Sequence, residues 1–207
     1  MTKFFFLTIA LSFPLVAASR VTLTNAQKAE AKKILSGWWK ESTNFTDDVL
    51  AGEVVSWARV DSAGDRQSMQ TRVVGVHPRS CTNSLRRIAQ YESYPKHLEF
   101  IKEATYDEGL QLVRFVMDHA LLPFPMELVF AIPRIRAPGA YPFTFPAGIF
   151  KGLAGTIRVE PLGGRCLYYM ETGWTGATTK IPDTAVQVFA QTLSRIGLEK
   201  LIRMSTL

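Results

Sequence analysis

The hydrophobic positions after residue 50 follow two periods, first that of β-strands and then that of an α-helix. Between residues 53 and 174 most segments alternate apolar and polar side chains, as strands with one buried face do. The last stretch, residues 181–204, has apolar side chains at three- and four-residue spacing, which share one helix face. These are Val186, Phe189, Leu193 and Ile196. The pattern predicts a curved sheet that grips one long amphipathic helix.

Turn residues divide the strand region into predicted hairpins. Gly64 lies between two alternating segments, and a Pro-Leu-Gly-Gly turn lies between the last two. The predicted strands are residues 53–61, 68–77, 101–105, 110–119, 126–132, 141–145, 152–160 and 165–174. A helical interruption is expected in residues 79–100, with a first helix through Ala89, a break at residues 91–95 and another turn from Lys96. His77, at a strand end, and His97, in this interruption, are expected at the surface.

The residues before the strands predict a leader and a helical extension. Residues 1–18 carry Lys3, an apolar run and small residues near Ala18, which is typical of a secretory signal peptide. Residues 24–39 are expected to form an amphipathic helix that Thr24 or Asn25 caps, and the polar residues 40–48 are expected to form turns. The predicted organisation is a signal peptide at 1–18, an N-terminal helical extension at 19–48 and one domain at 49–207.

Charge and cysteine content narrow the function classes. The net charge is +6, but Lys and Arg are spread along the chain, so a nucleic acid partner is not expected, and weak attraction to an anionic lipid surface stays an alternative. An exported chain meets an oxidising compartment, where Cys81 and Cys166 can form one disulfide. The sequence does not show whether the two cysteines lie within bonding distance, so the pairing stays open. Dispersed histidines and the absence of zinc-type spacing predict no metal and no cofactor.

The segment from Tyr91 to Ala104, YESYPKHLEFIKEA, carries a family resemblance. Tyr91, Tyr94, Pro95, Ile101 and Lys102 match the D-Y-x-x-Y-P-x-F-x-x-x-V-K signature of the START-like (SRPBCC) superfamily, which includes polyketide cyclase/dehydrase-type and lipid-binding proteins. Gln90 stands where many members have aspartate. The chain from about residue 50 to 205 resembles the exported branch of that superfamily in element order.

The resemblance implies an α+β helix-grip fold. A curved antiparallel sheet would wrap around the long C-terminal helix, and two short helices would close one end. Between sheet and helix the superfamily has a cavity for hydrophobic molecules. The strand and helix order read from the residues agrees with this fold independently.

The inward faces of the predicted strands and helix would line such a cavity. The candidate ligand-binding residues are Phe115, Met117, His119, Phe130, Phe143, Phe145, Tyr168, Met170, Trp174, Val186, Phe189 and Leu193. For any one of them a filled core is the simpler interpretation, whereas the resemblance favours a cavity for the set. The connection at residues 120–125 is apolar where a loop is normally polar, so Leu121, Leu122 and Phe124 are candidates for a portal loop; packing on the domain's own core is the alternative.

Three functions follow as hypotheses. The first is an exported, periplasmic carrier or binding protein for a hydrophobic small molecule, with a lipid as one candidate, in transient contact with a membrane surface. The second is a cyclase- or hydrolase-type enzyme in the same cavity, with His119 or Glu171 as acid/base. The third is an envelope interaction module with a filled core. No serine elbow, phosphate loop or dinucleotide fingerprint is present, so the sequence assigns no catalytic residue.

Overall fold

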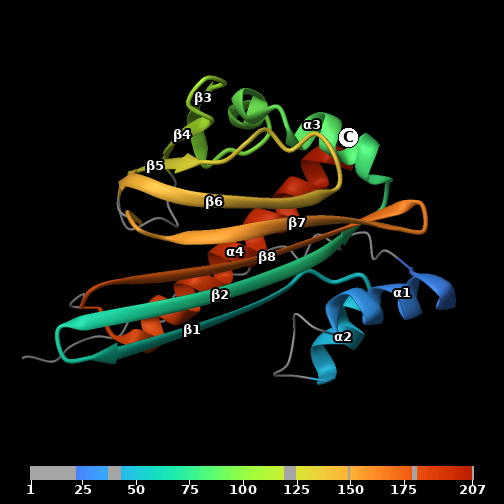
Figure 1. The fold of residues 1–207 in the computed structure, drawn as a ribbon, viewed down its shortest axis with the longest axis horizontal. Helices are drawn as coiled ribbons and strands as arrows, with labels where there is room; N and C mark the ends of the chain where they lie inside the picture. The colour runs from blue at the N-terminus through green and yellow to red at the C-terminus, as the bar shows by residue number, and fades with distance from the viewer. Residues whose placement is uncertain (1–21, 37–42, 119–124, 149, 179–180, 207) are drawn as a thin grey trace, which may run out of the picture.

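The computed structural model describes residues 22–36, 43–118, 125–148, 150–178 and 181–206 (Figure 1). Its elements follow the chain in the order α1 (Asn25–Leu35), α2 (Thr43–Leu50), β1 (Val55–Ala63), β2 (Arg66–His77), α3 (Cys81–Ile88), the 3₁₀-helix η1 (Tyr91–Lys96), β3 (Ile101–Asp107), β4 (Leu112–Met117), β5 (Met126–Ala131), β6 (Gly139–Gly148), β7 (Ala154–Leu162), β8 (Arg165–Ala177) and α4 (Asp183–Thr206). The predicted series of strands followed by one long helix is confirmed.

The described strands form one antiparallel sheet in the order β1-β2-β8-β7-β6-β5-β4-β3 (Figure 1). After β2 the chain crosses to the far edge and returns strand by strand, until β8 lies beside β2. The predicted β1–β2 hairpin has a two-residue turn, because Ala63 pairs with Arg66. Gly64 in that turn has a φ of +60°, a conformation that glycine adopts without steric cost.

Helix α4 lies across the concave side of the sheet, from the β1–β2 hairpin to α3 (Figure 1). At its start, Asp183 accepts hydrogen bonds from the backbone amide of Ser62 (2.9 Å), the Ser62 hydroxyl (2.7 Å) and the Gln67 amide (2.7 Å). Farther along, a Cβ on Gly75 would lie 3.1 Å from Ile202, so the bare glycine lets α4 approach β2 closely. The helix is therefore held along the β1–β2 side of the sheet.

The two short helices α3 and η1 close one end, as the helix-grip fold requires. Cys81, which begins α3, forms a disulfide with Cys166 in β8, so the pairing that the sequence left open is present. The Ser84 hydroxyl in α3 also shares a hydrogen bond with the Tyr168 hydroxyl of β8. A disulfide and a hydrogen bond thus join α3 to β8. With the curved sheet, the long α4 and these two short helices in place, the predicted α+β helix-grip class is confirmed.

Arg134, in the connection between β5 and β6, holds the same end together from the other side. Its guanidinium bonds the carboxylates of Glu92 (2.7 Å) and Glu108 (2.7 Å) and lies 4.2 Å from the ring centroid of Tyr106. The hydrogen bond from Arg134 lowers the pKa of Glu92. This one side chain links η1, the β3–β4 turn and the β5–β6 connection.

Helices α1 and α2 cover part of the opposite, convex face and build a second core with it. Leu35 of α1 and Val49 of α2 are buried against Val74 and Leu167 of the sheet. Of the two predicted caps, Thr24 rather than Asn25 caps the start of α1, and it forms a capping box with Gln27. The prediction of turns at residues 40–48 is wrong over α2, because Phe45 and Val49 are one helical turn apart and bury the same face.

Two local predictions around α3 are also wrong. His77 is fully buried rather than at the surface, because α3 and α4 cover the end of β2. The break expected at residues 91–95 is itself the helix η1, since Tyr91 and Tyr94 bury their rings while Pro95 fits a short 3₁₀ turn. His97 is exposed, as expected.

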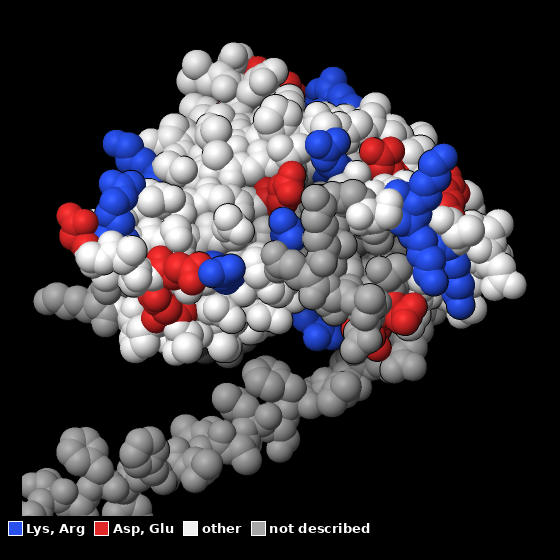
Figure 2. Space-filling view, turned by 60° about the horizontal axis from the view of Figure 1, so that its bottom comes forward, with Lys and Arg blue, Asp and Glu red and all other residues white. Residues whose placement is uncertain are grey.

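The charged side chains are dispersed on the molecular face drawn in Figure 2. Basic and acidic groups lie there in several separate places, and Lys and Arg side chains adjoin one another on the right of the view. Within the part of the chain that the structure describes, no helix combines the length and apolar character needed to cross a bilayer.

Candidate ligand-binding site

Strand alternation defines which side chains point toward α4. In β8 the even-numbered residues Tyr168, Met170 and Trp174 contact the main core, whereas Leu167 and Tyr169 contact the second core on the convex face. Cross-strand pairing extends the concave set sideways, because directly paired residues of adjacent strands point to the same face. The concave set on the far strands comprises Val113, Phe115 and Met117 of β4, Met126, Leu128 and Phe130 of β5, and Tyr141, Phe143 and Phe145 of β6.

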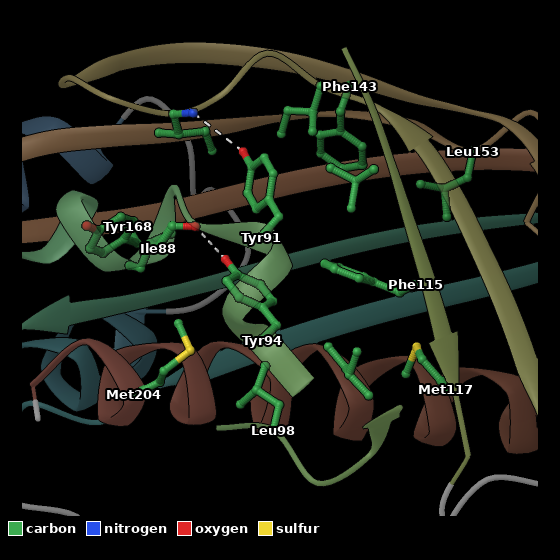
Figure 3. Close-up of a cluster of buried hydrophobic side chains, with 14 of the residues drawn as sticks. Ile88, Tyr91, Tyr94, Leu98, Phe115, Met117, Phe143, Leu153, Tyr168 and Met204 are labelled. Carbon is green, nitrogen blue, oxygen red and sulfur yellow. Dashed lines mark hydrogen bonds between the residues drawn. The ribbon is translucent and has the colours of Figure 1, made fainter. Parts of the chain in front are cut away.

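A row of aromatic rings crosses this concave face from η1 to the β6–β7 turn. Tyr94 stacks on Phe115 with ring centroids 5.5 Å apart, Phe115 meets Phe130 at 5.5 Å, and Phe130 stacks on Phe145 at 5.3 Å. The row ends at Phe150, 6.2 Å from Phe145. Figure 3 shows its inner part, with Tyr94 beneath Tyr91 and Phe115 directed into the space over α4.

Exposure rises along the aromatic row. Tyr94 and Phe115 are buried, whereas Phe130, Phe145 and Phe150 are partly exposed although they lie on the concave side. Rings on the inner face of a closed core would lose nearly all contact with solvent. The interior is therefore packed near η1 and opens toward β5, β6 and the β6–β7 turn.

The two tyrosines at the closed end have structural hydrogen bonds. The Tyr94 hydroxyl donates to the Ile88 carbonyl (2.7 Å), and the Tyr91 hydroxyl accepts from the Ile135 amide (Figure 3). The Tyr91 hydroxyl also donates to the Pro133 carbonyl (3.3 Å). Burial raises the pKa of Tyr91 to about 12 and that of Tyr94 well above its usual value. Both phenols are therefore protonated at neutral pH, and neither is available as a general base.

A few polar groups lie within the apolar surroundings of β2 and β8. The hydroxyls of Thr71 and Thr172 share a hydrogen bond of 2.6 Å across the two strands. The Trp174 indole donates to the Lys151 carbonyl at 3.2 Å, which fixes its ring at the end of the concave face. Because each hydroxyl also has free acceptor capacity, the threonine pair can orient one polar group of a ligand.

Helix α4 presents a narrower buried face than its sequence predicts. Ala190 and Met204 are buried, and Val186 packs on the same core. Phe189 and Leu193 are only partly buried and lie outside that core cluster. Because α4 is held close to β1 and β2, its face toward the sheet is centred on Ala190, and the larger side chains flank it.

The structure brings most of the predicted site residues together. Phe115, Met117, Phe143 and Tyr168 are buried in the core, and Phe130, Phe145, Met170, Trp174 and Val186 pack against it with part of their surface exposed. Phe189 and Leu193 stand at its margin. His119, Leu121, Leu122 and Phe124 lie outside the described residues, so their roles stay predictions.

Sequence analysis left several lining residues out. Tyr91 and Tyr94 entered only through the signature, yet Tyr94 begins the aromatic row. Phe150 and Leu153 belong to the β6–β7 connection, which has no alternating pattern. The apolar residues between Phe145 and Gly152 could have indicated Phe150, since apolar side chains in a turn normally pack on a neighbouring surface, whereas Leu153 fell within the predicted strand 152–160.

The structure tests one of the two acid/base candidates, because His119 lies outside the described residues. Glu171 lies on the opposite side of β8 from Met170, so its assignment as an acid/base group in the cavity is wrong. Among the described residues, no three carboxylate, histidine or cysteine side chains are grouped as a metal site would require. Two hollows lie elsewhere: one of about 640 Å³ between β1 and α4, and one of about 310 Å³ beside α3.

Comparison with known proteins finds likeness in structure alone. No family model matches the chain, and no curated protein matches its sequence. A START superfamily protein from Mycobacterium smegmatis matches with a TM-score of 0.51 and 16% identity, over 69% of this chain and 99% of that one. The Zhui aromatase/cyclase from Streptomyces sp. R1128 matches with a TM-score of 0.54 and 11% sequence identity, over 67% of this chain and 94% of that one.

The protein Ara h 8.0201 also matches, with a TM-score of 0.50 and 16% identity over 65% of this chain and 95% of that one. Identities this low establish shared architecture and no more. The sheet order and the gripped α4 are those of the helix-grip fold that the resemblance implied. The chain therefore has the START-like (SRPBCC) helix-grip fold.

Proposed function

We propose that this protein binds a hydrophobic small molecule between the concave face of its sheet and α4, and sequesters or carries it. The observation that carries the proposal is the partial exposure of Phe130, Phe145 and Met170 on the inner face of the sheet. Burial of apolar surface contributes roughly 25 cal/mol per Å², so covering these side chains would favour binding.

The lining favours a flat or extended apolar ligand. Aromatic rings about 5–6 Å apart present faces and edges on which another ring or a hydrocarbon chain can pack. The Thr71–Thr172 hydroxyl pair offers one hydrogen-bonding position within this surface. An apolar pocket with few polar groups is typical of sites that bind by burial and use polar contacts for orientation.

The structural likenesses support binding more than a particular reaction. One similar structure is named an aromatase/cyclase and another a START superfamily protein, and both names are compatible with a hydrophobic ligand. An enzyme would need an acid/base group within reach of the ligand. Glu171 points away, and the hydroxyls of Tyr91 and Tyr94 are engaged with backbone groups, so the described residues favour a carrier.

Export is part of the same proposal. The Cys81–Cys166 disulfide supports an oxidising compartment, and residues 1–18 have the pattern of a signal peptide. In a bacterium that compartment would be the periplasm. A tagged chain should appear in the periplasmic fraction, whereas a chain without residues 1–18 should remain in the cytoplasm. Retention of the full chain in the cytoplasm would contradict export.

Ligand binding is tested on protein purified without denaturation. Native mass spectrometry should show a bound mass in excess of the chain, and organic extraction should release an apolar molecule. A fluorescent apolar probe should bind the extracted protein saturably. A mass equal to that of the bare chain, with no probe binding, would overturn the proposal and favour a filled core. Entry through the apolar loop of Leu121, Leu122 and Phe124, in contact with a membrane, stays a prediction.

A further inference from the structure

A second hollow lies at the closed end of the fold, away from the exposed part of the aromatic row. It measures about 310 Å³ and is bounded by α3, η1 and the last turns of α4, which meet at the C-terminal end of the chain in Figure 1. Six residues line it: Arg86, Arg87, Gln90, Ser93, His97 and Met204.

The positive charge of this hollow has no counter-charge among the described residues. Arg86 and Arg87 are exposed in the last turn of α3, and neither guanidinium is in an ion pair with a described side chain. The acidic residues nearby along the chain are already engaged, because Glu92 pairs with Arg134 and Glu99 with Lys200. Two cations therefore face one concave surface without an anion.

The remaining lining residues add hydrogen-bond donors and an apolar floor. The Gln90 amide and His97 imidazole can each donate a hydrogen bond, and neither makes one to a described residue. Met204, which is 3% exposed, forms the base where α4 ends. A guanidinium presents a planar fork of donors that matches the oxygens of phosphate, and two adjacent arginines can grip one phosphate from two directions.

The size of the hollow limits the ligand that it can hold. A volume of about 310 Å³ is at the lower end of ligand pockets, large enough for a phosphate with a short substituent. We propose that this hollow binds a phosphate group, carried by a small phosphate ester or by a phospholipid headgroup. This site goes beyond the hydrophobic one, since it would hold either a separate phosphorylated ligand or the membrane surface itself.

The first test is titration of the intact protein with inorganic phosphate, followed by NMR of the arginine side chains and of His97. We expect saturable shifts at Arg86, Arg87 and His97. In the double variant Arg86→Gln/Arg87→Gln, phosphate affinity should fall about tenfold or more, because both charge-assisted forks are removed. The matched control is Lys32→Gln/Lys33→Gln, which removes the same charge from the exposed last turn of α1.

The second test separates the two sources of phosphate. Vesicles of phosphatidylcholine alone and of equimolar phosphatidylcholine and phosphatidylglycerol are sedimented with each protein. Binding to the anionic vesicles that the arginine variant loses and the lysine control keeps would identify a lipid headgroup. Saturable phosphate binding without vesicle binding would identify a soluble ester. The proposal would be overturned if the arginine variant and the lysine control lost binding equally. It would also be overturned if the parent protein showed neither saturable phosphate shifts nor binding to the anionic vesicles. Neither result depends on the hydrophobic site.

Discussion

His77 shows how a single side chain ties stability to pH. Its ring is fully buried at the end of β2, and Nδ1 accepts the amide hydrogen of Arg79 at 3.0 Å, so the neutral ring carries its proton at Nε2. Burial lowers the pKa of His77 below its usual value of 6.5, with the charge of Arg79 acting in the same direction. A proton on Nδ1 would displace the Arg79 amide, and the Arg79 carbonyl 3.3 Å away would accept from it instead, which offsets part of the effect of burial.

The lowered pKa predicts acid sensitivity of folding. In the unfolded chain His77 takes up its proton near pH 6.5, and in the folded chain it does so only at lower pH. The contribution of neutral His77 to the free energy of unfolding is therefore fully present above pH 6.5 and declines as the pH falls below it. Urea unfolding from neutral pH to about pH 5 should show this decline, and His77→Gln should flatten it. Ring resonances that titrate at or above 6.5 in the folded protein would contradict this account.

At the scale of elements, each helix is placed by a different physical cause. Helix α4 follows from its own pattern together with the bonds of Asp183. Helix α2 depends on tertiary contact, because the burial of Phe45, Val49 and Leu50 offsets its polar residues. Alternation predicted the strands and their inward faces correctly. It could not predict that α4 rests near Gly75, and so could not tell that Phe189 stays at the margin of the core.

The second core on the convex face predicts that α1 contributes to stability. Leu35 is 1% exposed, so Leu35→Ala should lower the free energy of unfolding by about 2–5 kcal/mol through lost burial and a residual cavity. The neighbouring Ile34 is only partly buried, and Ile34→Ala should cost less. Denaturant unfolding of both variants measures the difference. Equal, small losses would show that α1 merely rests on the sheet.

At the scale of the whole molecule, the sheet and α4 are joined along one side and at the closed end. Asp183 and Gly75 hold the helix to β1 and β2, and the disulfide and Arg134 secure the end that α3 and η1 cover. The strands β5 and β6 have no comparable tie to α4 among the described residues. Their aromatic side chains are thus left partly exposed, and this arrangement underlies the proposed ligand site.

The central claim, that apolar space remains between the concave face of the sheet and α4, is tested most directly by filling it. Met170 points into this space, and Thr175 lies exposed on the convex side of the same strand, so Met170→Trp and Thr175→Trp form a matched pair. Saturable binding of an apolar fluorescent probe is measured for both, with urea unfolding as a check on folding.

If the space exists, Met170→Trp should abolish probe binding and leave stability nearly unchanged, while Thr175→Trp should bind as the parent chain does. A packed interior would instead be overfilled, and Met170→Trp would then lose about 1–3 kcal/mol of stability with no probe binding in the parent to abolish. That second result would contradict the ligand site.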